Sequence, residues 1–157
     1  MNSLQIELFN KNLKHKIKYN QVQFSIVHYH IISEGLFVNM SESEAINRSG
    51  NMFEYAMLND IKLQAWSPLM ASWDDGCIID NPKYEKLNNK LEELANKYNV
   101  TKNAIGISFI LKHPSNIVPV IGTTSVKHLL EMIKAKDVNL TKEEWYSLYL
   151  SSGYFLP

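Results

Sequence analysis

A glycine- and hydroxyl-rich segment, Gly122-Thr123-Thr124-Ser125, follows an apolar stretch and precedes a helical pattern that carries Lys127 and His128. The first turn of a helix has free backbone N–H groups and a positive dipole end, which favour a bound anion. Glycine allows close backbone approach, hydroxyl groups donate hydrogen bonds, and Lys127 adds positive charge. These residues therefore indicate a phosphate site. They are equally typical of an ordinary strand-to-helix loop, and the P-loop spacing is absent.

An aromatic side chain stands at the end of another apolar stretch, where Trp66 is followed by Ser67-Pro68-Leu69. Ligands of α/β folds bind at the carboxyl ends of strands, so an exposed indole there could stack on a planar ring. Gln21 lies at the end of an earlier strand pattern and could hydrogen-bond an amide. The alternatives are an aromatic residue that packs on a neighbouring loop, and a glutamine that is solvated or pairs with an adjacent strand.

His28 and His30 could bind a metal ion together. Cys77 and Asp74-Asp75 are the candidates for further ligands, but nothing in the sequence fixes a third one, so we predict no metal site. Cys77 has no local signature of a nucleophile, and no catalytic residue is assigned.

The composition is that of one globular domain, with 157 residues, of which 45% are apolar and 20% are charged. Sixteen basic residues balance 16 acidic ones, which argues against nucleic-acid and membrane partners. Cys77 is the only cysteine, which favours a reducing compartment. The apolar run at Ala104–Leu111 is too short to span a bilayer, and the N-terminus lacks a secretion signal. We predict a cytoplasmic protein.

Strand and helix patterns alternate along the chain. Strands are predicted at Ile17–Val22, with a possible extension to Phe24, and at Ile61–Trp66 and Ile117–Ile121. Helices are predicted at Leu4–Leu13, Met52–Leu58, Pro82–Tyr98, Thr101–Lys112, Val126–Ile133 and Thr141–Tyr149. Two capping pairs are expected, Asn2 with Gln5 and Thr141 with Glu144. The region His28–Gly50 shows no clear pattern beyond exposed loops, and Met70–Asn81 is predicted to be a loop.

This alternation predicts an α/β fold with about three parallel strands and flanking helices. Three strands would leave two sheet edges unpaired, which is unfavourable for an isolated sheet. The sequence therefore indicates part of a larger α/β sheet or barrel.

Four segments occur together in a recognisable order and spacing: Asn20-Gln21-Val22, Gln64–Leu69, Pro119–Thr123 and Glu143–Tyr146. As a set they resemble the C-terminal half of a bacterial aldo-keto reductase, over nearly the whole chain. That family has a (β/α)8 TIM barrel and uses NADPH to reduce aldehydes and ketones. The resemblance implies that residues 1–157 form a single half-barrel containing the family's strands six to eight.

The resemblance also implies a role for each candidate residue. Gln21 corresponds to the glutamine that binds the nicotinamide carboxamide, and Trp66 to the aromatic residue that stacks on the nicotinamide ring. Ser67 and Leu69 belong to the loop at the pyrophosphate, and Gly122, Thr123, Thr124 and Ser125 to the segment at the adenosine 2′-phosphate.

Two features weaken the implied preference for NADPH. His128 stands where the family often has an arginine, and histidine is a weaker, pH-dependent partner for which Lys127 could compensate. Asp74-Asp75 would repel a pyrophosphate unless they point away. NADH therefore remains open as the cofactor, with no metal.

The family's catalytic Asp, Tyr, Lys and His lie in the first half of its barrel, and none has a counterpart here. Met1 aligns just after the family's fifth strand, which implies a truncated or split protein that is inactive alone. Its expected protein partner is a separate N-terminal half or a second copy of itself. A small carbonyl substrate is expected to bind only when the barrel is complete. The alternatives are a non-catalytic module that binds nucleotide or self-associates, and an unrelated small α/β protein.

Overall fold

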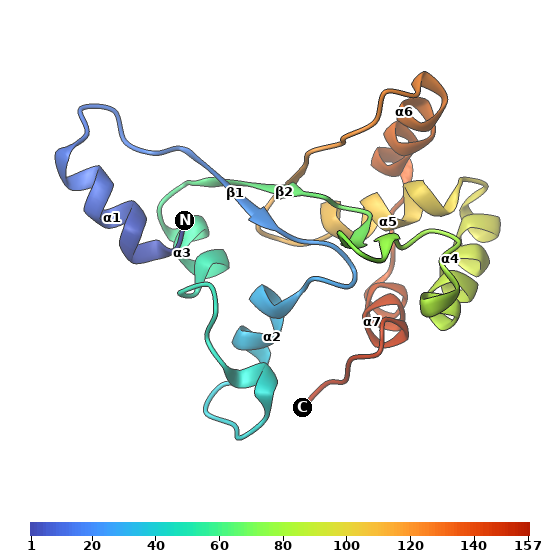
Figure 1. Cartoon of the computed structure of the whole chain (residues 1–157), viewed down its shortest axis with the longest axis horizontal. Coiled ribbons are helices and arrows are strands. Elements are labelled where there is room, and N and C mark those ends of the chain that lie inside the picture. The colour runs from blue at the N-terminus through green and yellow to red at the C-terminus, as the bar shows by residue number, and fades with distance from the viewer.

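The computed structural model describes all 157 residues, with helices and strands that alternate along the chain (Figure 1). The α-helices are α1 (Ser3–Asn12), α2 (His30–Leu36), α3 (Met52–Leu58), α4 (Glu85–Tyr98), α5 (Lys102–Leu111), α6 (Val126–Ile133) and α7 (Lys142–Ser151). The strands are β1 (Tyr19–Gln23), β2 (Lys62–Trp66), β3 (Met70–Ser72), β4 (Gly76–Cys77) and β5 (Val118–Pro119). Short 3-10 helices occur at η1 (Ser43–Ala45), η2 (Pro82–Tyr84) and η3 (Lys134–Asp137).

Three strands form a parallel sheet in the order β1-β2-β5, which confirms the predicted α/β architecture. Gln21 lies opposite Gln64, and Gln64 lies opposite Val118. The outer edges of β1 and β5 have no neighbouring strand, so the sheet is not a closed barrel. β5 is shorter than the predicted strand at Ile117–Ile121, because only Val118 and Pro119 keep the register with β2.

The helices cover one face of this sheet and leave the other face open. Successive side chains of a strand point to opposite faces. Asn20, Leu63 and Ala65 are accordingly buried on the helix side, whereas Tyr19 is 63% exposed on the other side.

Helix α5 lies at the centre of the covered face, and every residue from Ala104 to Ile110 is buried. Phe109 of this helix stacks on Trp145 of α7 with ring centroids 4.5 Å apart. The indole N–H of Trp145 donates to the Phe109 carbonyl oxygen over 2.9 Å, so this buried polar group is satisfied.

Capping residues in the sequence correctly predicted where several helices begin. Both expected capping boxes are present, at Asn2 with Gln5 and at Thr141 with Glu144. The Thr101 hydroxyl accepts from the Ala104 N–H at the start of α5. None of the helices has the length and apolar character needed to cross a membrane.

Two regions differ from the prediction. The segment His28–Gly50 contains α2 and η1, and Met70–Asn81 contains the antiparallel hairpin β3–β4. Helix α2 has seven residues, and Tyr29 before it makes no side-chain cap, so no start signal existed. The hairpin strands of three and two residues are too short for an alternating pattern.

Candidate functional site

A cleft of about 730 Å³ opens where β2 and β5 end, beside the β3–β4 hairpin. Its lining residues are Trp66, Ser67, Pro68, Leu69, Met70, Gly76, Cys77, Ile79, Asp80, Asn103, Val120, Ile121, Gly122, Thr123, His128 and Met132. Six of the ten candidate residues are among them: Trp66, Ser67, Leu69, Gly122, Thr123 and His128. Segments far apart in the sequence thus meet at one end of the sheet, because parallel neighbouring strands end at the same edge.

The turn after β2 places Trp66 and Leu69 in the cleft wall. β2 ends at Trp66, and Ser67 adopts a left-handed backbone with φ of 52°, which turns the chain out of the sheet. Leu69 then packs over Gly106 of α5. A Cβ atom at Gly106 would lie 2.5 Å from Leu69 Cδ2, so only glycine leaves room for Leu69 in its present position.

The loop after β5 is held by its own hydroxyl groups. Thr123 Oγ1 accepts from the Ser125 N–H over 3.1 Å, and Ser125 Oγ accepts from the His128 N–H over 3.4 Å. Ser125 is therefore the N-cap of α6. Each hydroxyl still has its own O–H free to donate. Gly122 has no neighbouring atom within 4 Å of the position of a Cβ, so its backbone is open to a ligand.

The remaining candidates do not line this cleft. Thr124, Ser125 and Lys127 lie outside its wall, and Thr124 and Lys127 are exposed. Gln21 lines a second cleft of about 530 Å³, which shares Trp66 with the first one. Trp66 therefore borders both clefts.

Gln21 lies in the middle of β1, not at its end, because the strand continues to Gln23. Its side-chain N–H donates to Gln64 Oε1 over 3.0 Å, so Gln21 pairs with the adjacent strand. Gln64 was not among the residues predicted for the site. A signal existed, since Gln21 and Gln64 each stand two residues before the last residue of their strands.

The acidic residue in the cleft is Asp80, which the sequence analysis also missed. Its carboxylate pairs with Lys102, and this hydrogen bond raises the pKa of Lys102 above its ordinary value. Asp74 and Asp75 do not line the cleft, and Asp75 pairs with Lys83. The sequence predicts repulsion of a pyrophosphate only if Asp74-Asp75 point towards it, and neither residue lines this cleft.

The structure does not assemble the possible metal ligands. His28 bonds through Nε2 to the Ala71 carbonyl oxygen, and burial lowers the pKa of His30. Cys77 lines the first cleft, whereas both histidines line the second. No group of three or more His, Cys, Asp or Glu side chains is placed to hold a metal ion.

Comparison with known proteins relates the chain to enzymes of about twice its size. The chain is 27% identical over 95 residues to 6-dehydroglucose reductase of Agrobacterium fabrum, a match covering 60% of this chain and 30% of that protein. It is 20% identical over 155 residues to oxidoreductase YdhF of Escherichia coli, covering 98% of this chain and 45% of that protein. The chain therefore spans less than half the length of the curated relatives that it matches.

Solved structures show the same relationship in the fold. A thermostable aldo-keto reductase solved with the inhibitor epalrestat matches 96% of this chain and 46% of its own, with a TM-score of 0.66 and 24% identity. A Bombyx mori aldo-keto reductase solved with NADP matches 96% of this chain and 42% of its own, with a TM-score of 0.62 and 19% identity. These likenesses show that the fold corresponds to about half of such a barrel.

The family model supplies the identification. The Aldo/keto reductase family model matches residues 2–149, which is nearly the whole chain. This family uses NADP(H). The chain belongs to the aldo/keto reductase family.

Proposed function

We propose that this chain is the dinucleotide-holding, C-terminal half of an NAD(P)H-dependent aldo-keto reductase and contains strands six to eight of the family's barrel. One observation carries the proposal: Trp66 after β2 and the Gly122-Thr123 segment after β5 line the same cleft. A ring-stacking side chain and an open, hydroxyl-bearing loop suit the two ends of a dinucleotide.

The residues present fit such a cofactor. Trp66 offers a planar face, and Gln21, oriented by Gln64, keeps its own carbonyl oxygen free for a carboxamide. Thr123 has a free O–H donor, and the open backbone at Gly122 admits close approach. When bound, the nicotinamide supplies the hydride for a carbonyl carbon.

The reduction also needs a proton donor as the alkoxide forms. The ionisable side chains of the cleft wall are Cys77, Asp80 and His128, and Asp80 is held in an ion pair. None of them corresponds to the family's Asp, Tyr, Lys and His. We therefore expect the first half of the barrel to supply the acid, and this chain alone to be inactive.

The substrate would be a small carbonyl compound bound once the barrel is complete. Relatives from Agrobacterium fabrum and Novosphingobium aromaticivorans are named 6-dehydroglucose reductase. An oxidised sugar is therefore the first substrate to test with the completed protein.

Calorimetric titration of the 157-residue chain with NADPH and NADH tests the cofactor site. We expect saturable binding that Trp66→Leu weakens by about fivefold, since ring stacking is worth about 1 kcal/mol. Trp73→Leu is the matched control, because Trp73 is 85% exposed and lies outside the cleft wall. A folded chain that binds neither dinucleotide, or a Trp66→Leu variant that binds as well as the parent, would contradict the proposal.

A second candidate function is assembly through the open face of the sheet. Tyr19, Val118 and Val120 are exposed on or beside this face. Helices α1 and α6 lie at opposite ends of the molecule (Figure 1), and each exposes apolar side chains. We propose that these surfaces bind the remaining half of the barrel. A second copy of the chain would use the same surfaces when that half is absent.

A further inference from the structure

The charge of the cleft differs from what the adenosine 2′-phosphate of NADP(H) requires. Its sixteen lining residues include no lysine and no arginine, and their one carboxylate is that of Asp80. His128 is the lining side chain that can become a cation, and it is exposed to solvent. A phosphate monoester carries about −1.5 to −2 charges at neutral pH and is best held by arginine or lysine.

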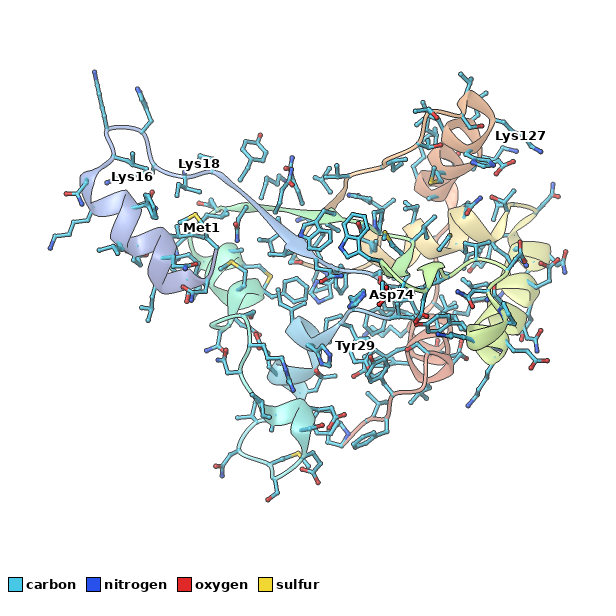
Figure 2. The ribbon with its side chains drawn as sticks, in the orientation of Figure 1. Met1, Lys16, Lys18, Tyr29, Asp74 and Lys127 are labelled. Atoms are coloured by element: carbon cyan, nitrogen blue, oxygen red, sulfur yellow. The ribbon has the colours of Figure 1, made fainter.

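Neither Lys102 nor Lys127 supplies a free cation in the cleft wall. Lys102 pairs with Asp80 and lies 3.4 Å from Glu92, so two carboxylates already neutralise it. Lys127 is exposed on α6, at the outer edge of the molecule (Figure 2). Neither side chain lines the cleft.

Asp80 lines the cleft next to the start of α5. Its partner Lys102 is the first residue of α5, and Asn103 next to it lines the cleft. Asn103 donates to Glu131 of α6 over 3.3 Å, which links this end of α5 to the helix that carries His128. The carboxylates of Asp80 and Glu131 therefore lie at the start of α5, with Asp80 in an ion pair with Lys102.

These groups suit a ribose hydroxyl. A carboxylate accepts a hydrogen bond from a free 2′-OH, which is how dinucleotide sites of other folds recognise NAD, whereas a 2′-phosphate requires a cation. A 2′-phosphate would instead have to compete with Asp80 and Glu92 for Lys102. Thr123 and Asn103 can add neutral hydrogen bonds to either ligand but no charge.

We infer that this cleft selects NAD(H) over NADP(H), in contrast to the family's use of NADP(H), because its wall presents the Asp80 carboxylate and no free lysine or arginine. The inference rests on the proposed dinucleotide site. It assigns to Asp80 and His128 the role of specificity residues.

The test measures the dissociation constants of NADH and NADPH for the full 157-residue chain by calorimetry, at one fixed ionic strength. We expect NADH to bind about tenfold tighter than NADPH, which is the size of effect that one missing charge-assisted hydrogen bond produces. Equal affinities, or tighter binding of NADPH, would overturn the inference and leave the proposed function intact. Binding of neither dinucleotide by the folded chain would overturn the proposed function itself.

Two variants test the assigned residues. His128→Arg should tighten NADPH binding about tenfold and leave NADH unchanged, because arginine adds a bidentate phosphate partner. Asp80→Asn should also favour NADPH, since it removes a carboxylate and releases Lys102. If neither variant changes the ratio of NADH to NADPH affinity, Asp80 and His128 are excluded as the source of the selectivity.

Matched controls make the same substitutions away from the cleft. His15→Arg adds a charge in the exposed loop after α1, and Asp74→Asn removes one from the exposed tip of the hairpin. Neither residue lines the cleft, so both controls should keep the NADH-to-NADPH ratio of the parent chain. A control that shifts the ratio as far as its partner variant would show that net charge, not position, sets the preference.

Discussion

Gln21 donates its side-chain N–H to Gln64 Oε1 over 3.0 Å, and the two residues lie directly opposite each other in β1 and β2. The pair lies on the open face of the sheet, next to the strand end that carries Trp66. This hydrogen bond uses one N–H of Gln21 and leaves its carbonyl oxygen in a defined orientation. Gln64 is therefore a positioning residue for Gln21.

Gln64→Leu should weaken dinucleotide binding by about fivefold, because an intramolecular hydrogen bond of this kind is worth about 1 kcal/mol. Both side chains are partly solvated, so the free energy of unfolding should change little. Calorimetric titration with NADH and urea denaturation measure the two quantities. Gln64→Glu keeps the acceptor oxygen for Gln21 and should restore most of the affinity. Equal weakening in both variants would assign Gln64 a direct contact with the ligand.

The Gly122→Ala substitution should weaken ligand binding and leave the stability of the fold nearly unchanged. No atom lies within 4 Å of the added methyl group, and the backbone of Gly122 is outside the left-handed region. The free energy of unfolding should therefore stay within about 0.5 kcal/mol of the parent value. Affinity for the dinucleotide should fall severalfold, because the methyl group occupies the space that the ligand needs. Unchanged affinity would show that the ligand does not approach this part of the backbone.

The Gly106→Ala substitution, in α5, should change the cleft by displacing Leu69 from its wall. The new methyl group would lie 2.5 Å from Leu69 Cδ2, so Leu69 has to rotate away from its present position. Alanine is favoured over glycine in a helix by about 1 kcal/mol, which offsets part of the repacking cost. We expect a small change in the melting temperature and weaker NADH binding in calorimetry. A crystal structure of the variant with Leu69 unmoved would contradict this account.

Histidine titration should make the fold less stable in mild acid. Burial lowers the pKa of His113 from 6.5 to about 4, and its ring packs against Phe53 with centroids 4.3 Å apart. Below pH 6.5 the unfolded chain therefore takes up a proton that the folded chain accepts only near pH 4. Stability is full above pH 6.5 and falls between pH 6.5 and 4, by about 3 kcal/mol at most from this group.

Urea denaturation at a series of pH values from 7 to 4 measures this loss. His113→Leu should flatten the slope, while His15→Leu should leave it unchanged because His15 is exposed. Some slope will remain, since burial also lowers the pKa of His30. A His113→Leu variant with the slope of the parent chain would exclude His113 as its source.

Association of the isolated chain should depend on the apolar face of α1. Leu4 and Leu8 are 78% and 65% exposed, which is unusual for leucine on a helix of a folded protein. Sedimentation velocity should show concentration-dependent association of the parent chain and a shift towards monomer for Leu4→Glu combined with Leu8→Glu. Lys11→Glu, on the same helix, controls for the added negative charge. A parent chain that stays monomeric at all concentrations would contradict the assembly role.

Much of the fold could be predicted because its signals are local. The apolar spacing of Leu87, Leu91 and Leu94 predicted α4, and all three side chains are buried. Capping residues marked the starts of α1, α5 and α7. The alternation of strands and helices was enough to predict a parallel sheet, and the meeting of Trp66 with Thr123 followed from it.

The sequence by itself determined the element order, the parallel sheet and the segments that carry the candidate site, because periodicity and capping depend on neighbours in the chain. Only the tertiary structure decided that Asp80 and Asn103 enter the cleft, that Lys127 stays outside it, and that Gln21 pairs with Gln64. Those outcomes depend on packing and ion pairs between residues distant in sequence, such as Lys102 with Asp80. Charge in a cleft is set by which side chains reach it, and no local pattern encodes that.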